Sequence, residues 1–77
     1  RGLDAAGQAL AAVEAAQQAA AEAARLLRRR HEEGMTTLAD LLQVEARAAQ
    51  LDAQLVDART GVLIARAYLD FAWGDAR

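Results

Sequence analysis

The residues that could do chemistry in this chain are few. His31 is the single histidine, and Glu32 and Glu33 follow it directly. The 77 residues include no serine, no cysteine and no glycine-rich phosphate-binding loop, so no nucleophilic or phosphate-handling site can be assembled. One histidine without a second histidine or a cysteine is also a poor metal site. We therefore predict that the chain is not an enzyme and uses no cofactor or metal.

Composition narrows the classes of partner. The formal net charge is −2 and aromatic residues make up 4% of the chain, so neither a basic field nor a stacking platform for nucleic acid is present. No apolar run approaches the ~20 residues that a membrane-spanning helix needs. We therefore expect the chain neither to bind nucleic acid nor to span a membrane.

Long helices must position these residues. The stretch 3–32 is dominated by alanine, glutamate, glutamine, leucine and arginine, which are strong helix formers. An apolar seam runs along it with alternating steps of three and four residues, interrupted at Gln17. The seam comprises Leu3, Ala6, Leu10, Val13, Ala20, Ala24 and Leu27. A neighbouring alanine face, which would let another helix approach closely, comprises Ala9, Ala12, Ala16, Ala19 and Ala23.

The stretch 37–73 repeats this pattern without a break. Its apolar seam comprises Leu41, Val44, Ala48, Leu51, Leu55, Ala58, Val62, Ala65, Leu69 and Ala72. A flanking apolar row comprises Leu42, Ala49, Val56 and Leu63. So wide a stripe indicates contact with more than one neighbouring helix. Gly61, inside this helix, either permits close packing or is merely tolerated.

A turn at about residues 33–36 separates the two helices. Gly34 can take the left-handed conformation that ends a helix, and Thr36 or Thr37 can cap the next one. Thr37 and Asp40 have the spacing of a capping box. Arg28 and Arg29 complement the dipole of the first helix and have Glu32 and Glu33 four residues ahead of them. The predicted fold class is all-α: residues 1–77 form one long antiparallel helical hairpin, a coiled coil.

The second half of this hairpin resembles a known family. Gly34, Asp40 and Leu42 have the spacing of a helix-tip pattern found in the TolC family of outer-membrane efflux and secretion channels. Ala65, Leu69, Ala72 and Gly74 resemble the end of that family's returning helix. The resemblance covers Arg28 to Gly74, and it covers the first helix by composition only.

The resemblance implies a role in transport. Family members are trimers with a β-barrel in the outer membrane of Gram-negative cells and a long α-helical barrel in the periplasm. A periplasmic adaptor protein docks at the tip of the helical barrel and links it to an inner-membrane pump. By resemblance, this chain is one hairpin of the helical barrel and a fragment of a larger channel protein. Two helices alone would also leave the alanine face and the flanking row uncovered.

The resemblance also assigns site residues. Asp40 would lie at the channel constriction, where three copies form an acidic ring that attracts cations. Gln43 stands where many members have a second acid, which predicts a less cation-selective constriction. Asp40 could equally be a first-turn acid that caps its helix, and the two roles are compatible.

Four further residues are assigned to the tip. His31, Gly34, Met35 and Thr36 would form the channel entrance and the adaptor-docking surface. His31 stands where many members have a tyrosine that holds the tip closed. A solvated histidine at the end of a helix is the alternative interpretation.

Two other functions stay open. The chain could be the helical hairpin of a periplasmic adaptor, although those hairpins usually carry a serine near the tip and this chain has none. It could also be a generic coiled-coil oligomerisation module. In isolation, we expect the chain to associate through its uncovered seams, most simply as a dimeric four-helix bundle.

Overall fold

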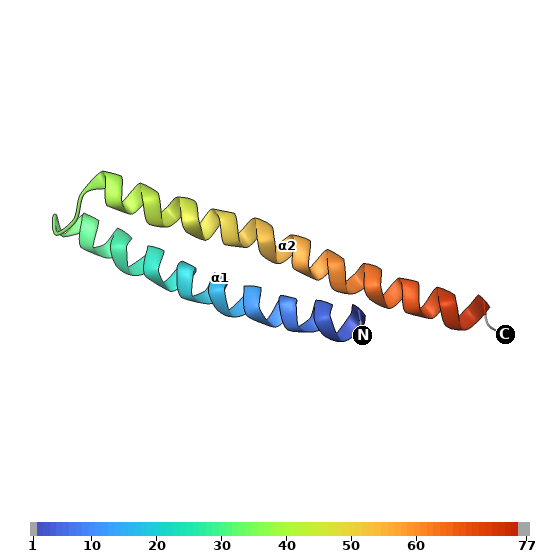
Figure 1. The fold of residues 1–77 in the computed structure, drawn as a ribbon. Coiled ribbons are helices and arrows are strands. Elements are labelled where there is room, and N and C mark those ends of the chain that lie inside the picture. The colour runs from blue at the N-terminus through green and yellow to red at the C-terminus, as the bar shows by residue number, and fades with distance from the viewer. Residues whose placement is uncertain (1, 76–77) are drawn as a thin grey trace.

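The computed structural model describes residues 2–75, which form two long helices side by side and antiparallel, joined by one turn (Figure 1). Helix α1 spans Gly2–Glu32 and helix α2 spans Leu38–Asp75. The Cα radius of gyration is 18.0 Å, whereas a compact domain of this length would have about 11 Å. The predicted all-helical hairpin is confirmed, and its shape is a rod with no central globular core.

The two helices meet along the predicted seams, which we call the inner seam. Its most buried members are Ala20 and Ala24 of α1 and Leu41 and Leu51 of α2. Most of the remaining members are half-buried, because each helix has only one neighbour. Leu69 stays 42% exposed, and Ala72 is exposed as well. The inner seam therefore closes from the turn to about Ala65 and is open beyond it.

The turn is built from a specific set of backbone hydrogen bonds. Gly34 has φ 74°, the left-handed conformation predicted for it. Its N–H donates to His31 O at 3.0 Å, and the N–H of Met35 donates to Arg30 O at 2.8 Å. This pair of bonds satisfies carbonyls that the end of α1 would otherwise leave without partners.

Thr37 starts the second helix. Its Oγ1 accepts a hydrogen bond from the N–H of Asp40 at 3.1 Å, as an N-cap does. Of the two threonines considered, Thr37 is therefore the cap. Helix α2 begins at Leu38, one position after the approximate start that the sequence predicts, because a cap residue lies outside the helical hydrogen-bonding pattern.

Two polar contacts join the helices. Gln17 Nε2 donates to Asp52 Oδ1 at 2.9 Å. Arg28 donates to Glu45 Oε2 from both Nε, at 2.9 Å, and a terminal nitrogen, at 2.6 Å. The expected pairing of Arg28 with Glu32 was wrong, because Glu45 of the facing helix lies within reach of the guanidinium. Arg29 and Glu33 are the other expected pair. They form none of the salt bridges found among the described residues.

The far ends of the helices do not match. Helix α2 has 38 residues and α1 has 31, so α2 is longer by about 10 Å at 1.5 Å per residue. In Figure 1 the red end of α2 extends past the blue start of α1. We call this end of the rod the base and the turn end the tip. Side chains of the last turns of α2 therefore have no helix beside them.

Candidate functional site

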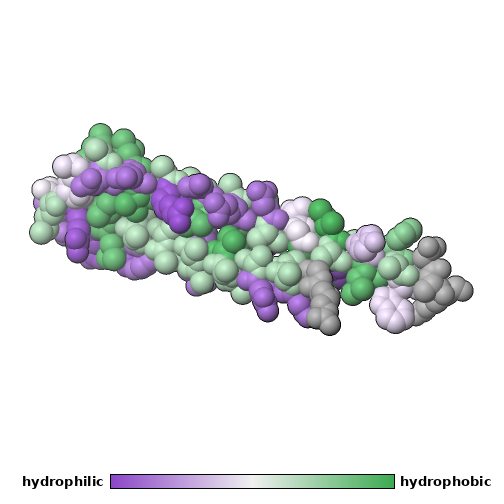
Figure 2. Space-filling view, in the orientation of Figure 1, coloured by the Kyte–Doolittle hydropathy of each residue, from purple (hydrophilic) through white to green (hydrophobic). Residues whose placement is uncertain are grey.

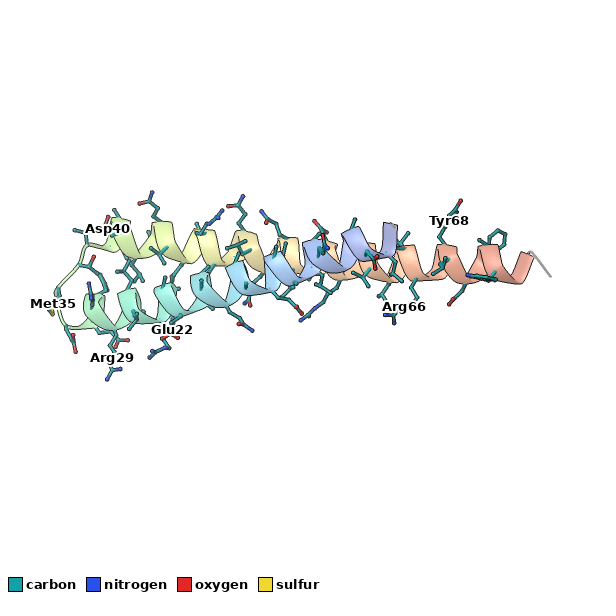
Figure 3. All side chains as sticks on the ribbon, turned by 60° about the horizontal axis from the view of Figure 1, so that its bottom comes forward. Glu22, Arg29, Met35, Asp40, Arg66 and Tyr68 are labelled. Carbon is teal, nitrogen blue, oxygen red and sulfur yellow. The ribbon has the colours of Figure 1, made fainter. Side chains whose placement is uncertain are left out.

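The tip brings together the residues predicted to form a channel entrance. His31 and Thr36 are half-buried, while Gly34 and Met35 are exposed. Met35 is 72% exposed, and Figure 3 shows it at the extreme end of the rod. The tip thus presents one flexible apolar side chain to whatever approaches along the rod axis, and such a side chain adapts readily to a partner surface.

Asp40 lies in the first turn of α2, just behind the tip. Its backbone N–H is engaged by Thr37, but its carboxylate is exposed and accepts none of the hydrogen bonds found among residues 2–75. The reciprocal half of a capping box, in which the N–H of Thr37 would donate to this carboxylate, is not among those bonds. Asp40 therefore keeps a first-turn position favourable to the helix dipole while its side chain remains available to other groups.

Asp40 and Gln43 begin a row of exposed polar side chains that the sequence analysis did not single out. The row continues along α2 in alternating steps of three and four residues. This polar row comprises Asp40, Gln43, Arg47, Gln50, Gln54 and Asp57, and all six are exposed. Figure 3 shows Asp40 and Tyr68 pointing to the same side of the rod, which is the side of this row. The polar row could have been found in the sequence by searching the polar residues for the same alternating steps of three and four.

Helix α2 also carries a second apolar seam. The flanking row predicted from the sequence alternates with small residues, and the two together form a complete repeat of three and four residues. This outer seam comprises Ala39, Leu42, Ala46, Ala49, Ala53, Val56, Thr60, Leu63 and Ala67, and every member is exposed. At 3.6 residues per turn, the inner seam, outer seam and polar row lie on three different sides of α2, and a narrow charged strip lies between the two seams. α2 therefore has one apolar side that the hairpin leaves without a partner.

The alanine face of α1 is also open. Ala9, Ala12, Ala19 and Ala23 are exposed, and Ala16 is half-buried. Figure 2 shows weakly hydrophobic surface, in pale green, over the middle of the rod with hydrophilic side chains along its edges. Gly61 is exposed too, and a Cβ added there would meet no atom within 4 Å. Close packing against Gly61 is therefore not a feature of this hairpin.

A group of aromatic side chains occupies the base. Tyr68, Phe71 and Trp73 are each exposed by about two thirds or more. They lie on the part of α2 that α1 does not reach, so nothing in the hairpin packs over them. Their side chains are therefore open to solvent at the base of the hairpin.

Charged side chains cluster on α1 near the tip. Glu22 and Arg25 form an exposed ion pair, and the Arg25 guanidinium lowers the pKa of the Glu22 carboxyl mainly through its hydrogen bonds. A shallow open depression nearby is lined by Arg25, Arg28, Arg29 and Glu32. Two of its arginines are already engaged, by Glu22 and Glu45. The depression is a solvated surface, and it holds no converging set of ligands.

Two other kinds of site are missing from the described residues. Across residues 2–75, no three histidine or carboxylate side chains come together as metal ligands would. Neither α1 nor α2 has a stretch apolar enough to cross a membrane.

The hairpin was compared with known proteins at three levels. No protein-family model, no curated protein and no solved structure matches the chain. A functional assignment is therefore argued from the hairpin itself, that is, from its sequence and its geometry.

Proposed function

We propose that this hairpin is a wall segment of a TolC-like exit duct, with its tip as the channel entrance. The observation that carries the proposal is the three-sided character of α2. One side packs on α1 through the inner seam, a second offers the open outer seam, and the third carries the polar row. A helix in the wall of a water-filled helical barrel needs two neighbouring helices, and it needs polar residues that face the passage.

The sequence resemblance supplies the kind of barrel. The tip pattern of Gly34, Asp40 and Leu42 and the tail pattern ending at Gly74 resemble those of the outer-membrane efflux and secretion channels. In this proposal three parent chains assemble in the outer membrane, and the hairpin lies in the periplasm. His31, Gly34, Met35 and Thr36 meet a periplasmic adaptor that is joined to an inner-membrane pump. The segment is passive, and the pump provides the energy.

Asp40 and Gln43 form the constriction in this proposal. They are the first two members of the polar row and lie close behind the exposed Met35. A ring of Asp40 carboxylates favours cations, and a neutral Gln43 adds no second ring of charge. The carboxylate of Asp40 is exposed and accepts none of the hydrogen bonds found in the described part of the hairpin, which suits a group that faces a passage.

The test uses the channel protein that contains this hairpin, purified from outer membranes and reconstituted in planar bilayers. Asp40→Asn should shift the reversal potential in a salt gradient toward lower cation selectivity. Asp57→Asn, at the other end of the polar row, is the matched control and should shift it less. An Asp40→Asn channel with unchanged selectivity would remove Asp40 from the constriction.

The compartment gives a separate check. An antibody against the hairpin should detect its protein in the outer-membrane fraction of the source cells. Detection in the inner-membrane fraction, as expected for an adaptor, would reject the exit duct. Detection in the cytosol would favour a generic coiled-coil module.

A further inference from the structure

The outer seam of α2 is a long apolar surface that the hairpin leaves exposed. Leu42, Val56 and Leu63 are each more than half exposed, and Leu63 reaches 63%. The accessible surface of the chain is 5858 Å², whereas a compact monomer of this mass would have about 4,500 Å². The surplus exceeds the roughly 800 Å² that each partner buries in a standard interface. The chain therefore has enough uncovered surface for a stable partner.

We propose that the outer seam of α2 docks on the outer seam of a second copy of the same 77-residue chain. The two α2 helices run antiparallel, and a two-fold axis passes close to Ala53. The product is a four-helix bundle with the two α2 helices at its centre. This proposal concerns the free chain and does not rest on the exit-duct function.

The sizes of the seam residues are compatible with this arrangement. Ala53 is the middle of the nine seam positions, with four positions on either side of it. Antiparallel packing about Ala53 sets Leu42 opposite Leu63 of the second copy, and Ala49 opposite Val56. The two leucine layers lie one position in from the ends of the contact, and each layer between them contains an alanine, which lets the helices approach closely. A two-fold interface also closes on itself, so association stops at two copies.

The charges beside the seam favour the same direction. Between the inner and outer seams of α2 lies a charged flank, which comprises Glu45, Asp52, Arg59 and Arg66. Its acids lie toward the tip and its arginines toward the base. Antiparallel packing sets the two charged flanks side by side, with Glu45, which also pairs with Arg28, near Arg59 of the second copy and Asp52 near its own counterpart. Parallel packing would instead set each charged flank beside the polar row of the second copy, where Glu45 has no arginine of that flank to meet. Asp52, nearest the axis, already accepts a hydrogen bond from Gln17.

The alanine face of α1 is the competing partner for the outer seam. Alanines contribute little apolar area per residue, so the seam would gain less burial on this face than on another leucine-bearing seam. Association of that kind would also be head-to-tail, and each assembly would keep one open seam at either end. The test must therefore separate a closed dimer from a growing chain.

Disulfide trapping can separate the closed dimer from the growing chain. The chain has no native cysteine, so only introduced thiols can cross-link. Ala53→Cys should oxidise rapidly to a covalent dimer, since the introduced thiol would face its own counterpart across the axis. Gln18→Cys, on an exposed position of α1 away from both seams, is the control and should cross-link several-fold more slowly. Equal rates for the two variants would overturn the proposal. Faster cross-linking of Ala53→Cys with Ala16→Cys than with itself would assign the seam to the alanine face.

Sedimentation equilibrium supplies the second measurement. The wild-type chain should be dimeric at high micromolar concentration, and Leu63→Glu should raise the dissociation constant at least tenfold. Leu26→Glu introduces the same charge at an exposed leucine of α1 and should change the constant little. Circular dichroism of both variants checks that the helices persist. A wild-type chain that remains monomeric at millimolar concentration would refute the dimer.

Discussion

The tip half of the rod and its base half are built from the same helices but are held together differently. The tip half, residues 17–55, contains all four buried apolar side chains of the hairpin's described part: Ala20, Ala24, Leu41 and Leu51. It also contains the capped turn and both polar contacts between the helices. The base half contains half-buried small residues and the exposed aromatic side chains. The two helices alone therefore bury apolar side chains in the tip half, while the base half leaves its apolar side chains partly or largely uncovered.

This difference has a simple physical origin. At the tip the covalent turn holds the two helices close, and Arg28 and Gln17 bond to the facing helix. Toward the base no such turn or polar contact is found among the described residues, and the larger seam residues there, Leu10, Val13 and Val62, are only half-buried. α1 then ends before α2 does. A rod with one closed end and one open end suits a segment that presents its tip to solvent or a partner and its base to more protein.

The largest expected effect compares two leucines of the same repeat. Leu51 is 4% exposed and Leu69 is 42% exposed. Leu51→Ala should lower the free energy of unfolding by about 2–4 kcal/mol, because it leaves a cavity in the closed part of the inner seam. Leu69→Ala should cost less than about 1 kcal/mol, since its side chain is already partly in water. Urea unfolding followed by circular dichroism in dilute solution measures both. Equal losses would show that the base half is packed as firmly as the tip half.

Two glycines give the next largest contrast. Gly34→Ala should lower the free energy of unfolding by about 1–2 kcal/mol, because φ 74° is unfavourable for a residue with a Cβ. Gly61→Ala should raise it by up to about 1 kcal/mol, because the added methyl group meets no atom and alanine favours the helix. Thermal unfolding of the two variants and of the wild type measures both changes in stability. A destabilising Gly61→Ala would indicate that another helix packs closely at that position.

The smallest expected effect tests the polar contacts. Arg28→Ala should lower the free energy of unfolding by about 0.5 kcal/mol, because its ion pair with Glu45 is partly exposed. The loss should shrink as salt is added. Arg47→Ala, in the exposed polar row, is the control, since Arg47 has no ion pair among the described residues. A salt-independent loss for Arg28→Ala would indicate that packing of the arginine side chain matters more than its charge.

Much of this hairpin was predictable because its determinants are local. Helix propensity, the alternating spacing of apolar residues, a glycine at a helix end and a threonine ahead of the next helix each act over a few residues. They predicted both helices, the turn, the left-handed Gly34 and the inner seam. The tip residues predicted as a site, His31, Gly34, Met35 and Thr36, lie together because they are neighbours in the sequence. Their role in adaptor docking stays a prediction.

Contacts between the helices were not predictable in the same way. Arg28 has Glu32 one turn ahead, yet it bonds to Glu45, which is 17 residues away. Gln17 was treated as a break in the seam, yet it lies half-buried and donates to Asp52, 35 residues away. Each outcome depends on how far one helix is rotated and shifted against the other. Local spacing leaves that rotation undetermined.

The sequence by itself determined that this chain is two helices with one turn, because backbone and side-chain preferences within a few residues are enough to specify those elements. Only the tertiary structure decided which side of α2 packs against α1 and where along α2 this contact ends. α2 carries two apolar repeats of equal spacing, and α1 can pack on one of them at a time. Because α1 packs on the inner seam, Leu42, Val56 and Leu63 remain exposed to water beside the polar row that begins at Asp40.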